Sequence, residues 1–197
     1  NSDLSAAGKV RQKITSHAAL RYRNKFANMA KDDLIKNMET DKGSIEISEV
    51  EVENTQNILE PIQVSYNYEL MDSVDEVGDK LYFSPLLFLA EKESPFKLEK
   101  RNYPIDFIAP YKDKYFINIM LPENYKVESM PESEIFKFKD GEVSYSYIAK
   151  ENGQYLQLSV TFDLVNSLID PSDYEVFKDF YEKIIEKQAE QIVLSKV

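Results

Sequence analysis

Between residues 134 and 166, apolar and polar side chains alternate along the chain, and two turn signals interrupt the alternation. The turn signals are Asp140-Gly141 and Asn152-Gly153. Alternation with a period of two predicts half-buried strands. Asp-Gly and Asn-Gly predict hairpins, because type I′ turns require positive φ at both central residues. The sequence therefore predicts a three-stranded antiparallel meander over 134–166.

Similar alternation predicts further strands. The clearest runs from Ile62 to Leu70, and residues 45–52 alternate with a one-residue slip that predicts a β-bulge at Ser48–Glu49. Within the run Arg101–Pro110, Pro104 and Pro110 enclose a mainly apolar stretch. Proline cannot donate a hydrogen bond to a β-ladder. This run is interpreted as a short strand that enters the β-rich region. Shorter strands are predicted at 9–15, 80–83, 115–121 and 126–130.

Three segments have the 3.6-residue period of an amphipathic helix. The first follows Ser16 as a potential cap, and the second covers 31–40. The third opens at Asp170-Pro171 and covers about four to five turns, with Asp170 expected to accept hydrogen bonds from free amides. Residues 191–194 could continue this helix or form a strand. The predicted class is α+β, with antiparallel, β-sandwich-like sheets, two N-terminal helical segments and a C-terminal amphipathic helix.

The length of 197 residues fits a single β-rich domain over 1–197, with a possible division into 1–100 and 101–197. The net charge of −11 disfavours binding to nucleic acid, because acidic surfaces repel phosphates. No apolar run approaches the length of a membrane span. Asn1–Leu4 contains neither an initiator Met nor a signal segment, so we expect the chain to begin inside a longer protein.

Few residues are candidates for catalysis or metal binding. The chain has no Cys, so a thiolate nucleophile is excluded, and His17 is its one histidine. We interpret His17 as a surface or capping residue, because a triad needs both a nucleophile and an oriented base. Four acidic residues lie close together in a loop, without the spacing or turn glycine of a calcium loop: Asp72, Asp75, Glu76 and Asp79. We interpret them as a solvated loop and expect no metal, no cofactor and no catalytic residue.

Three further features carry alternatives. Asp106 has apolar neighbours and is interpreted as a buried carboxylate that accepts from backbone amides or pairs with Arg101, although carboxylates could also serve a hydrolase. The apolar stretch Leu86–Leu89 is either core or a docking surface. Five tyrosines could form a binding platform or pack across strands: Tyr66, Tyr68, Tyr145, Tyr147 and Tyr155.

Several segments, in the same order, resemble the C-terminal β-rich domain that follows the papain-like core in bacterial transglutaminase-like proteins. The resembling segments span nearly the whole chain: Gly8–Lys25, Arg101–Pro110, Leu121–Val127, Phe180–Ile184 and Glu186–Leu194. The resemblance implies an exported protein, at the cell surface or in the periplasm. It places the catalytic Cys, His and Asp upstream of this region, so no catalytic residue is transferred to this chain.

The resemblance implies a non-catalytic accessory domain that packs on, or positions, an upstream transglutaminase-like core of the same polypeptide. A module that binds extracellular glycan or peptide through exposed tyrosines is the alternative. A carboxylate-based hydrolase ranks last.

Overall fold

A computed structural model describes residues 3–197 and confirms an α+β fold built mainly from antiparallel sheets. The chain divides into two compact units, Asn1–Val74 (unit 1) and Asp75–Val197 (unit 2). This boundary lies earlier than the division at 100/101 that the sequence analysis gave as a possibility beside a single domain. The reason is a long-range pairing, because residues 80–83 form a ladder with residues 192–195 near the C-terminus. Nothing local in the sequence marks that partner.

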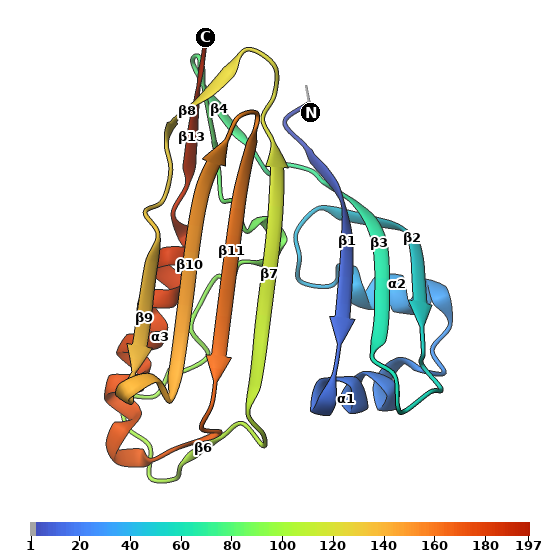
Figure 1. Cartoon of the computed structure of the whole chain (residues 1–197), viewed down its shortest axis with the longest axis vertical. Helices are drawn as coiled ribbons and strands as arrows, with labels where there is room; N and C mark the ends of the chain where they lie inside the picture. Colours follow the sequence, from blue (N-terminus) through green and yellow to red (C-terminus); the bar gives the residue numbers. More distant parts are fainter. Residues whose placement is uncertain (1–2) are drawn as a thin grey trace. The chain divides into compact units, whose positions relative to one another are not determined.

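Unit 1 is a three-stranded antiparallel sheet with two helices, and its strand order is β1-β3-β2 (Figure 1). Its elements are β1 (Ala6–Ile14), α1 (Ser16–Phe26), α2 (Lys31–Glu39), β2 (Ile45–Glu53) and β3 (Ile62–Leu70). The predicted bulge is confirmed, because the β2–β3 register shifts between Ser48 and Glu51 and Glu49 has φ of 51°. Gly8 lies opposite Tyr68, and a Cβ there would lie 2.9 Å from the tyrosine ring. Because Gly8 has no side chain, the ring of Tyr68 can lie over β1 at this position.

Unit 2 contains a four-stranded sheet of order β7-β11-β10-β9, a second of order β4-β5-β13-β8, and the two-stranded sheet β12-β6 (Figure 1). Its strands are β4 (Asp75–Val77), β5 (Lys80–Phe83), β6 (Ile105–Asp106), β7 (Tyr111–Met120), β8 (Tyr125–Ser129), β9 (Glu134–Phe138), β10 (Val143–Asn152), β11 (Tyr155–Leu164), β12 (Leu168–Ile169) and β13 (Ile192–Lys196). Its helical elements are η1 (Leu87–Leu89), η2 (Lys139–Gly141), η3 (Pro171–Asp173) and α3 (Tyr174–Ala189).

The predicted meander is confirmed as β9, β10 and β11, and β7 adds a fourth strand. Its turns differ from the predicted type I′ pair. Asn152 pairs with Tyr155, so the loop is Gly153-Gln154, and only Gly153 of the two has positive φ. At the other end, Phe138 pairs with Val143 and a short 3-10 helix over Lys139–Gly141 fills a longer loop. The dipeptides marked the hairpins correctly but not the turn geometry.

The helix ends also differ in detail from the sequence expectation. Helix α1 begins at Ser16 itself, and its cap position, Thr15, makes no side-chain cap hydrogen bond. Before α3, the 3-10 turn Pro171–Asp173 intervenes, and the amide of Asp173 donates to the backbone oxygen of Asp170 at 3.0 Å. The expected side-chain cap by Asp170 is therefore absent. Residues 192–196 form strand β13 rather than more helix.

Helix α3 covers one face of the sheet β7-β11-β10-β9 in unit 2 (Figure 1). Phe177 is fully buried, and its ring lies 5.1 Å from that of Phe96 and 5.2 Å from that of Phe138, measured between centroids. Tyr145 and Tyr147 of β10 belong to the same core. Edge-to-face contacts of this kind stabilise a core beyond the area that they bury.

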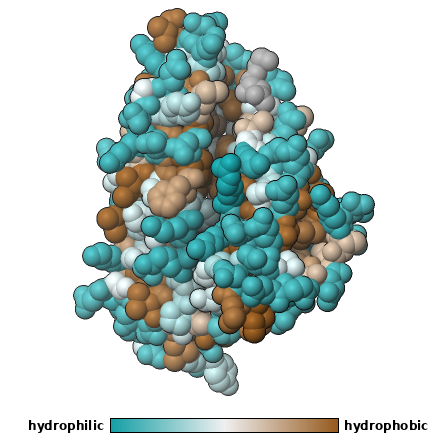
Figure 2. Space-filling model, turned by 45° about the vertical axis from the view of Figure 1, so that its right-hand side comes forward, coloured by the Kyte–Doolittle hydropathy of each residue, from teal (hydrophilic) through white to brown (hydrophobic). Residues whose placement is uncertain are grey.

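Figure 2 shows that polar side chains cover most of the face in view, with apolar ones in several separate places. This fits a chain with 35 acidic and 24 basic residues. Within residues 3–197, no helix has the length and apolar character needed to cross a membrane.

Lys187 of α3 is buried and carries its charge into the protein. Its ammonium lies 2.8 Å from Glu190 and 3.1 Å from Glu134 of β9, and it donates to the backbone oxygen of Glu132. Burial lowers the pKa of Lys187, but the hydrogen bonds to Glu190 and Glu134 outweigh burial and hold the pKa above its ordinary value of 10.5. This contribution to stability is therefore fully present below about pH 10.5 and is lost as the pH rises through the folded-state pKa.

Because both carboxylates are half-exposed and Lys187 is not, removing the lysine should cost less than removing its partners. We expect Lys187→Met to lower the free energy of unfolding by about 1 kcal/mol, and the double change Glu134→Gln with Glu190→Gln to lower it by about 3 kcal/mol. Urea denaturation at pH 7 measures both.

The matched control is Glu93→Gln, which breaks the exposed pair with Lys97 and should leave the midpoint unchanged. A larger loss for Lys187→Met than for the double variant would contradict this account of the buried ammonium.

Candidate functional site

The structure separates most of the residues that the sequence singled out. His17 is exposed on α1. The acidic residues of the 72–79 segment are all exposed, and the boundary between the two units falls among them. No group of three or more His, Cys, Asp or Glu side chains in residues 3–197 is arranged to hold a metal ion.

Asp106 is exposed, so the expectation that it is buried is wrong. It lies in the two-residue strand β6, where Ile105 faces the core and Asp106 faces away from it. Its carboxylate accepts a hydrogen bond from the amide of Ile108 at 2.7 Å, as the backbone-amide interpretation predicted. Arg101 instead lies over the ring of Tyr174, 5.8 Å from its centroid.

The five tyrosines proposed as a platform do not form one. Tyr66, Tyr145 and Tyr147 are buried, and only Tyr155 is exposed. Strand alternation directs Tyr66 into the core of unit 1, and Tyr145 and Tyr147 into the core of unit 2. Burial raises the pKa of Tyr66 to about 12. Leu86 is also buried, which confirms core packing for the start of the Leu86–Leu89 stretch.

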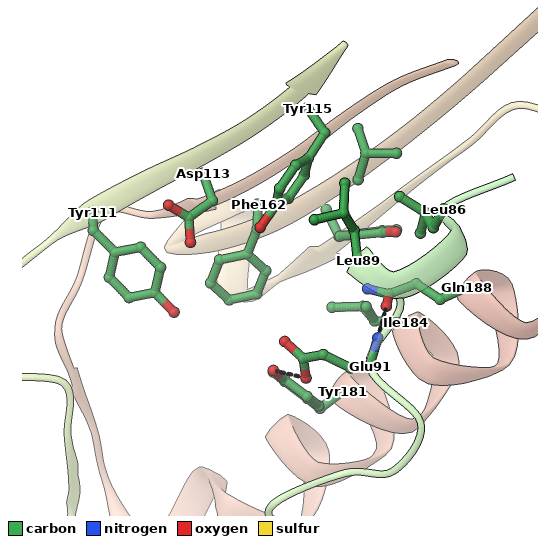
Figure 3. Close-up of a pocket in the computed structure, with 12 residues that line it drawn as sticks. Leu86, Leu89, Glu91, Tyr111, Asp113, Tyr115, Phe162, Tyr181, Ile184 and Gln188 are labelled. Atoms are coloured by element: carbon green, nitrogen blue, oxygen red, sulfur yellow. Dashed lines mark hydrogen bonds between the residues drawn. The ribbon is translucent and has the colours of Figure 1, made fainter. Parts of the chain in front are cut away.

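A different set of tyrosines lines a cavity of about 60 Å³ in unit 2 (Figure 3). The cavity has apolar residues, four tyrosines, two carboxylates and one amide around it. Its lining residues are Leu86, Leu89, Glu91, Tyr111, Asp113, Tyr115, Tyr145, Val160, Phe162, Tyr181, Ile184 and Gln188.

Strand register brings the sheet side of the pocket together. Tyr111, Asp113 and Tyr115 alternate along β7, so their side chains share one face of the sheet. Asp113 pairs with Phe162 of β11, which in turn pairs with Tyr145 of β10. These three side chains therefore form one row across the sheet.

Helix α3 and the segment after η1 form the facing wall. Tyr181, Ile184 and Gln188 share one face of α3, because they are three and four residues apart. The Gln188 side-chain oxygen accepts from the amide of Glu91 at 2.7 Å. The hydroxyl of Tyr181 donates to the carboxylate of Glu91 at 2.7 Å (Figure 3). Glu91 is thus held against the helix from both its backbone and its side chain.

The two carboxylates give the pocket a negative potential. Glu91 and Asp113 are exposed, whereas Tyr145, Leu86 and Ile184 are buried. Burial, followed by the charges of Asp113 and Glu91, raises the pKa of Tyr115. Burial also raises the pKa of Tyr181, and its hydrogen bond to Glu91 adds to that shift. Both phenols are therefore neutral hydrogen-bond donors at pH 7.

The hydroxyl of Tyr145 is buried and has no hydrogen-bond partner within the protein. Gln188 lies nearby and slightly offsets the rise that burial causes in the pKa of Tyr145, but the contact falls short of hydrogen-bond geometry. Glu91 and Tyr115 lie close enough for their charges to affect the same hydroxyl. A buried hydroxyl without a partner is costly, so a group that supplied a hydrogen bond to it would be favoured.

Sequence reasoning found only part of this pocket. Tyr145 and the Leu86–Leu89 stretch were singled out for other reasons, and Glu91, Asp113 and Tyr181 were missed. The alternation Tyr111-x-Asp113-x-Tyr115 was a usable signal, because it puts an acid and two aromatic rings on one strand face. No local pattern places Glu91 beside Tyr181, 90 residues later.

Replacing Tyr145 by Phe removes a hydroxyl that has no partner in the protein. We expect the free energy of unfolding to stay unchanged or to rise by up to about 1 kcal/mol. Tyr174→Phe is the matched control, since that hydroxyl donates to the backbone oxygen of Leu98 at 2.9 Å. It should lower the free energy of unfolding by about 1 kcal/mol. Equal losses for both variants in urea denaturation would show that the Tyr145 hydroxyl is satisfied.

Comparison with known proteins identifies one family. The family model described as "Domain of Unknown Function with solved-structure structure (DUF3858)" matches residues 79–194, which is 116 of the 197 residues. The match lies within unit 2 and includes every residue that lines the pocket. No curated protein matches the chain, and no solved structure matches it. Since the match covers more than half of its length, the chain belongs to the DUF3858 family.

Proposed function

We propose that this chain is a non-catalytic accessory region of a transglutaminase-like protein, and that unit 2 binds a small ligand in its pocket. The pocket itself is the observation that carries the proposal. Two carboxylates, four tyrosines and an amide line one cavity with buried apolar side chains beside it. A few placed polar groups around an apolar cavity are typical of sites that bind small molecules.

Binding fits this arrangement better than hydrolysis. A carboxylate-based hydrolase needs two acids whose surroundings drive their pKa values apart, one of them usually in an apolar site. Glu91 and Asp113 are both exposed, and Glu91 already accepts a hydrogen bond from Tyr181. We therefore keep hydrolysis as the least favoured function.

The alternative function, binding of an extracellular glycan or peptide through tyrosines, is kept with a different set of tyrosines. The rings that were proposed as a platform are mostly buried, but Tyr111, Tyr115 and Tyr181 line the cavity instead. This supports recognition of a group that enters a pocket, rather than of a flat chain of sugars laid across a sheet.

The accessory role is supported by the resemblance to bacterial transglutaminase-like proteins. Four of the resembling segments lie within the residues that match the family: Arg101–Pro110, Leu121–Val127, Phe180–Ile184 and Glu186–Leu194. In this proposal the reactive groups belong to a papain-like core upstream, and the protein acts in the periplasm or at the cell surface.

Ligand binding can be tested with a screen of neutral, cationic and anionic fragments by ¹H–¹⁵N NMR on the whole chain. We expect some fragments to shift the amide signals of residues that line the pocket. Leu89→Trp should abolish these shifts, because the larger side chain fills the cavity that Leu89 lines. Leu98→Trp is the matched control, since Leu98 is exposed and lies outside the pocket. Equal responses in both variants, or no shifts at all, would refute the proposal.

The accessory role predicts that the native reading frame encodes a papain-like core, with Cys, His and Asp, upstream of Asn1. The isolated chain should then associate with that core, as measured by analytical ultracentrifugation of the two purified pieces. A reading frame without such a core, or hydrolytic activity of the chain alone that depends on one of its own side chains, would overturn this part of the proposal.

A further inference from the structure

We infer that the pocket of unit 2 binds the protonated head of a primary amine. This inference rests on the proposed function and names the class of ligand. It combines the charge of the pocket, its aromatic rings, one unsatisfied hydroxyl and a comparison with Lys187 of the same protein.

The charges around the cavity favour a cation. Asp113 projects from the sheet and Glu91 from the segment after η1, so the two carboxylates approach the cavity from different walls (Figure 3). None of the twelve lining residues is Lys, Arg or His. The hydrogen bond from Tyr181 to Glu91 comes from a neutral hydroxyl and leaves the negative charge in place. A cation entering here gains attraction from both carboxylates.

Aromatic rings line the same space. The rings of Tyr111 and Phe162 stack with centroids 5.6 Å apart, and the ring of Tyr181 meets Phe162 at 66° with centroids 6.3 Å apart. Their different inclinations present both ring faces and ring edges near the cavity. Cations are attracted to the faces of such rings, and more strongly where water is excluded.

Hydrogen bonding selects a primary amine over a quaternary one. A primary ammonium has three donors and no acceptor. The lining includes the carboxylates of Glu91 and Asp113 and also Tyr145, whose buried hydroxyl oxygen has no partner in the protein. A quaternary ammonium cannot donate, so it would leave Tyr145 unsatisfied.

The protein already binds one ammonium of its own in this way. Lys187, also on α3, places its ammonium between Glu190 and Glu134 and 5.9 Å from the ring centroid of Tyr147. Tyr147 and Tyr145 lie two residues apart on the same face of β10. On the side of α3 toward β9, Lys187 thus supplies the cation. On the side toward β7, Glu91 and Asp113 line a cavity that has no basic residue in its lining.

The cavity limits the size of the head group. A water molecule needs about 10–15 Å³ of such volume, so about 60 Å³ holds a group of roughly four or five non-hydrogen atoms. The rest of a longer ligand would extend out of the cavity past the exposed carboxylates of Glu91 and Asp113. A free alkylamine and a lysine side chain of a peptide share this head group.

Four probes separate charge, hydrogen bonding and shape: n-butylammonium, 1-butanol, tetramethylammonium and butyrate. Each is titrated into the whole chain at pH 7 and low salt, and the shifts of pocket amides are followed by NMR. We expect n-butylammonium to bind with a Kd on the order of millimolar, as suits so small a ligand. The other three should bind at least tenfold more weakly. A fifth probe, Nα-acetyl-lysine methylamide, stands for a lysine side chain of a peptide. Comparing its Kd with that of n-butylammonium shows whether the pocket prefers a peptide lysine or a free alkylamine.

Variants test the assigned residues. Glu91→Gln and Asp113→Asn should each weaken n-butylammonium binding at least fivefold, and Tyr145→Phe should weaken it without loss of stability. The controls Glu186→Gln and Asp179→Asn make the same changes on exposed positions of α3 outside the pocket, and should leave Kd within twofold.

The possible failures are distinguishable. If 1-butanol or tetramethylammonium binds as tightly as n-butylammonium, the pocket is a binding site but the inferred ligand class is wrong. The class is also wrong if n-butylammonium binds the two carboxylate variants as tightly as it binds the native chain. If none of the probes shifts a pocket amide, the inference is overturned, and the broader fragment screen then decides the proposed function separately.

Discussion

Packing of α3 against the inner face of the sheet β7-β11-β10-β9 is the interaction on which unit 2 depends. Phe177 is buried at its centre, among the rings of Phe96, Phe138 and Tyr181. Val143, Tyr145 and Tyr147 of β10 are buried in the same core. The cavity and the buried Lys187 both lie along this contact.

The two edges of the sheet meet the helix differently. At β9 the buried ammonium of Lys187 joins the helix to Glu134, so the contact is filled by charge pairing within the protein. At β7 the side chains of Tyr111, Asp113 and Tyr115 line a cavity together with residues of α3. The proposed binding site at this edge needs no additional element, because it is the part of the helix–sheet contact that the protein's own side chains leave unfilled.

Keeping such a cavity has a cost in stability. The buried hydroxyl of Tyr145 has no partner in the protein, and a cavity forgoes the dispersion contacts that close packing would provide. Cores usually avoid both. The ligand that we propose would offset both costs, because it would fill the cavity and give the hydroxyl a partner.

Local pattern was enough for most elements of the fold and for few residues of the site. The bulge in β2, the strand Ile62–Leu70 and the three-stranded meander follow from alternation and turn residues, which act over a few neighbours. The same reasoning placed Asp106 in the core, because apolar neighbours cannot reveal which face of a two-residue strand is covered. It also left open whether five tyrosines form a binding surface or pack across strands, because alternation identifies a face without saying what packs on it.

The sequence by itself thus determined the α+β class, most of the strands and the C-terminal helix, since short-range backbone and side-chain preferences decide these. Only the tertiary structure decided the unit boundary and the pocket. Both depend on pairings between distant segments, β5 with β13 for the boundary and Glu91 with Tyr181 and Gln188 for the pocket. Such contacts form where packing brings two segments together, and neither segment carries a local mark of its partner.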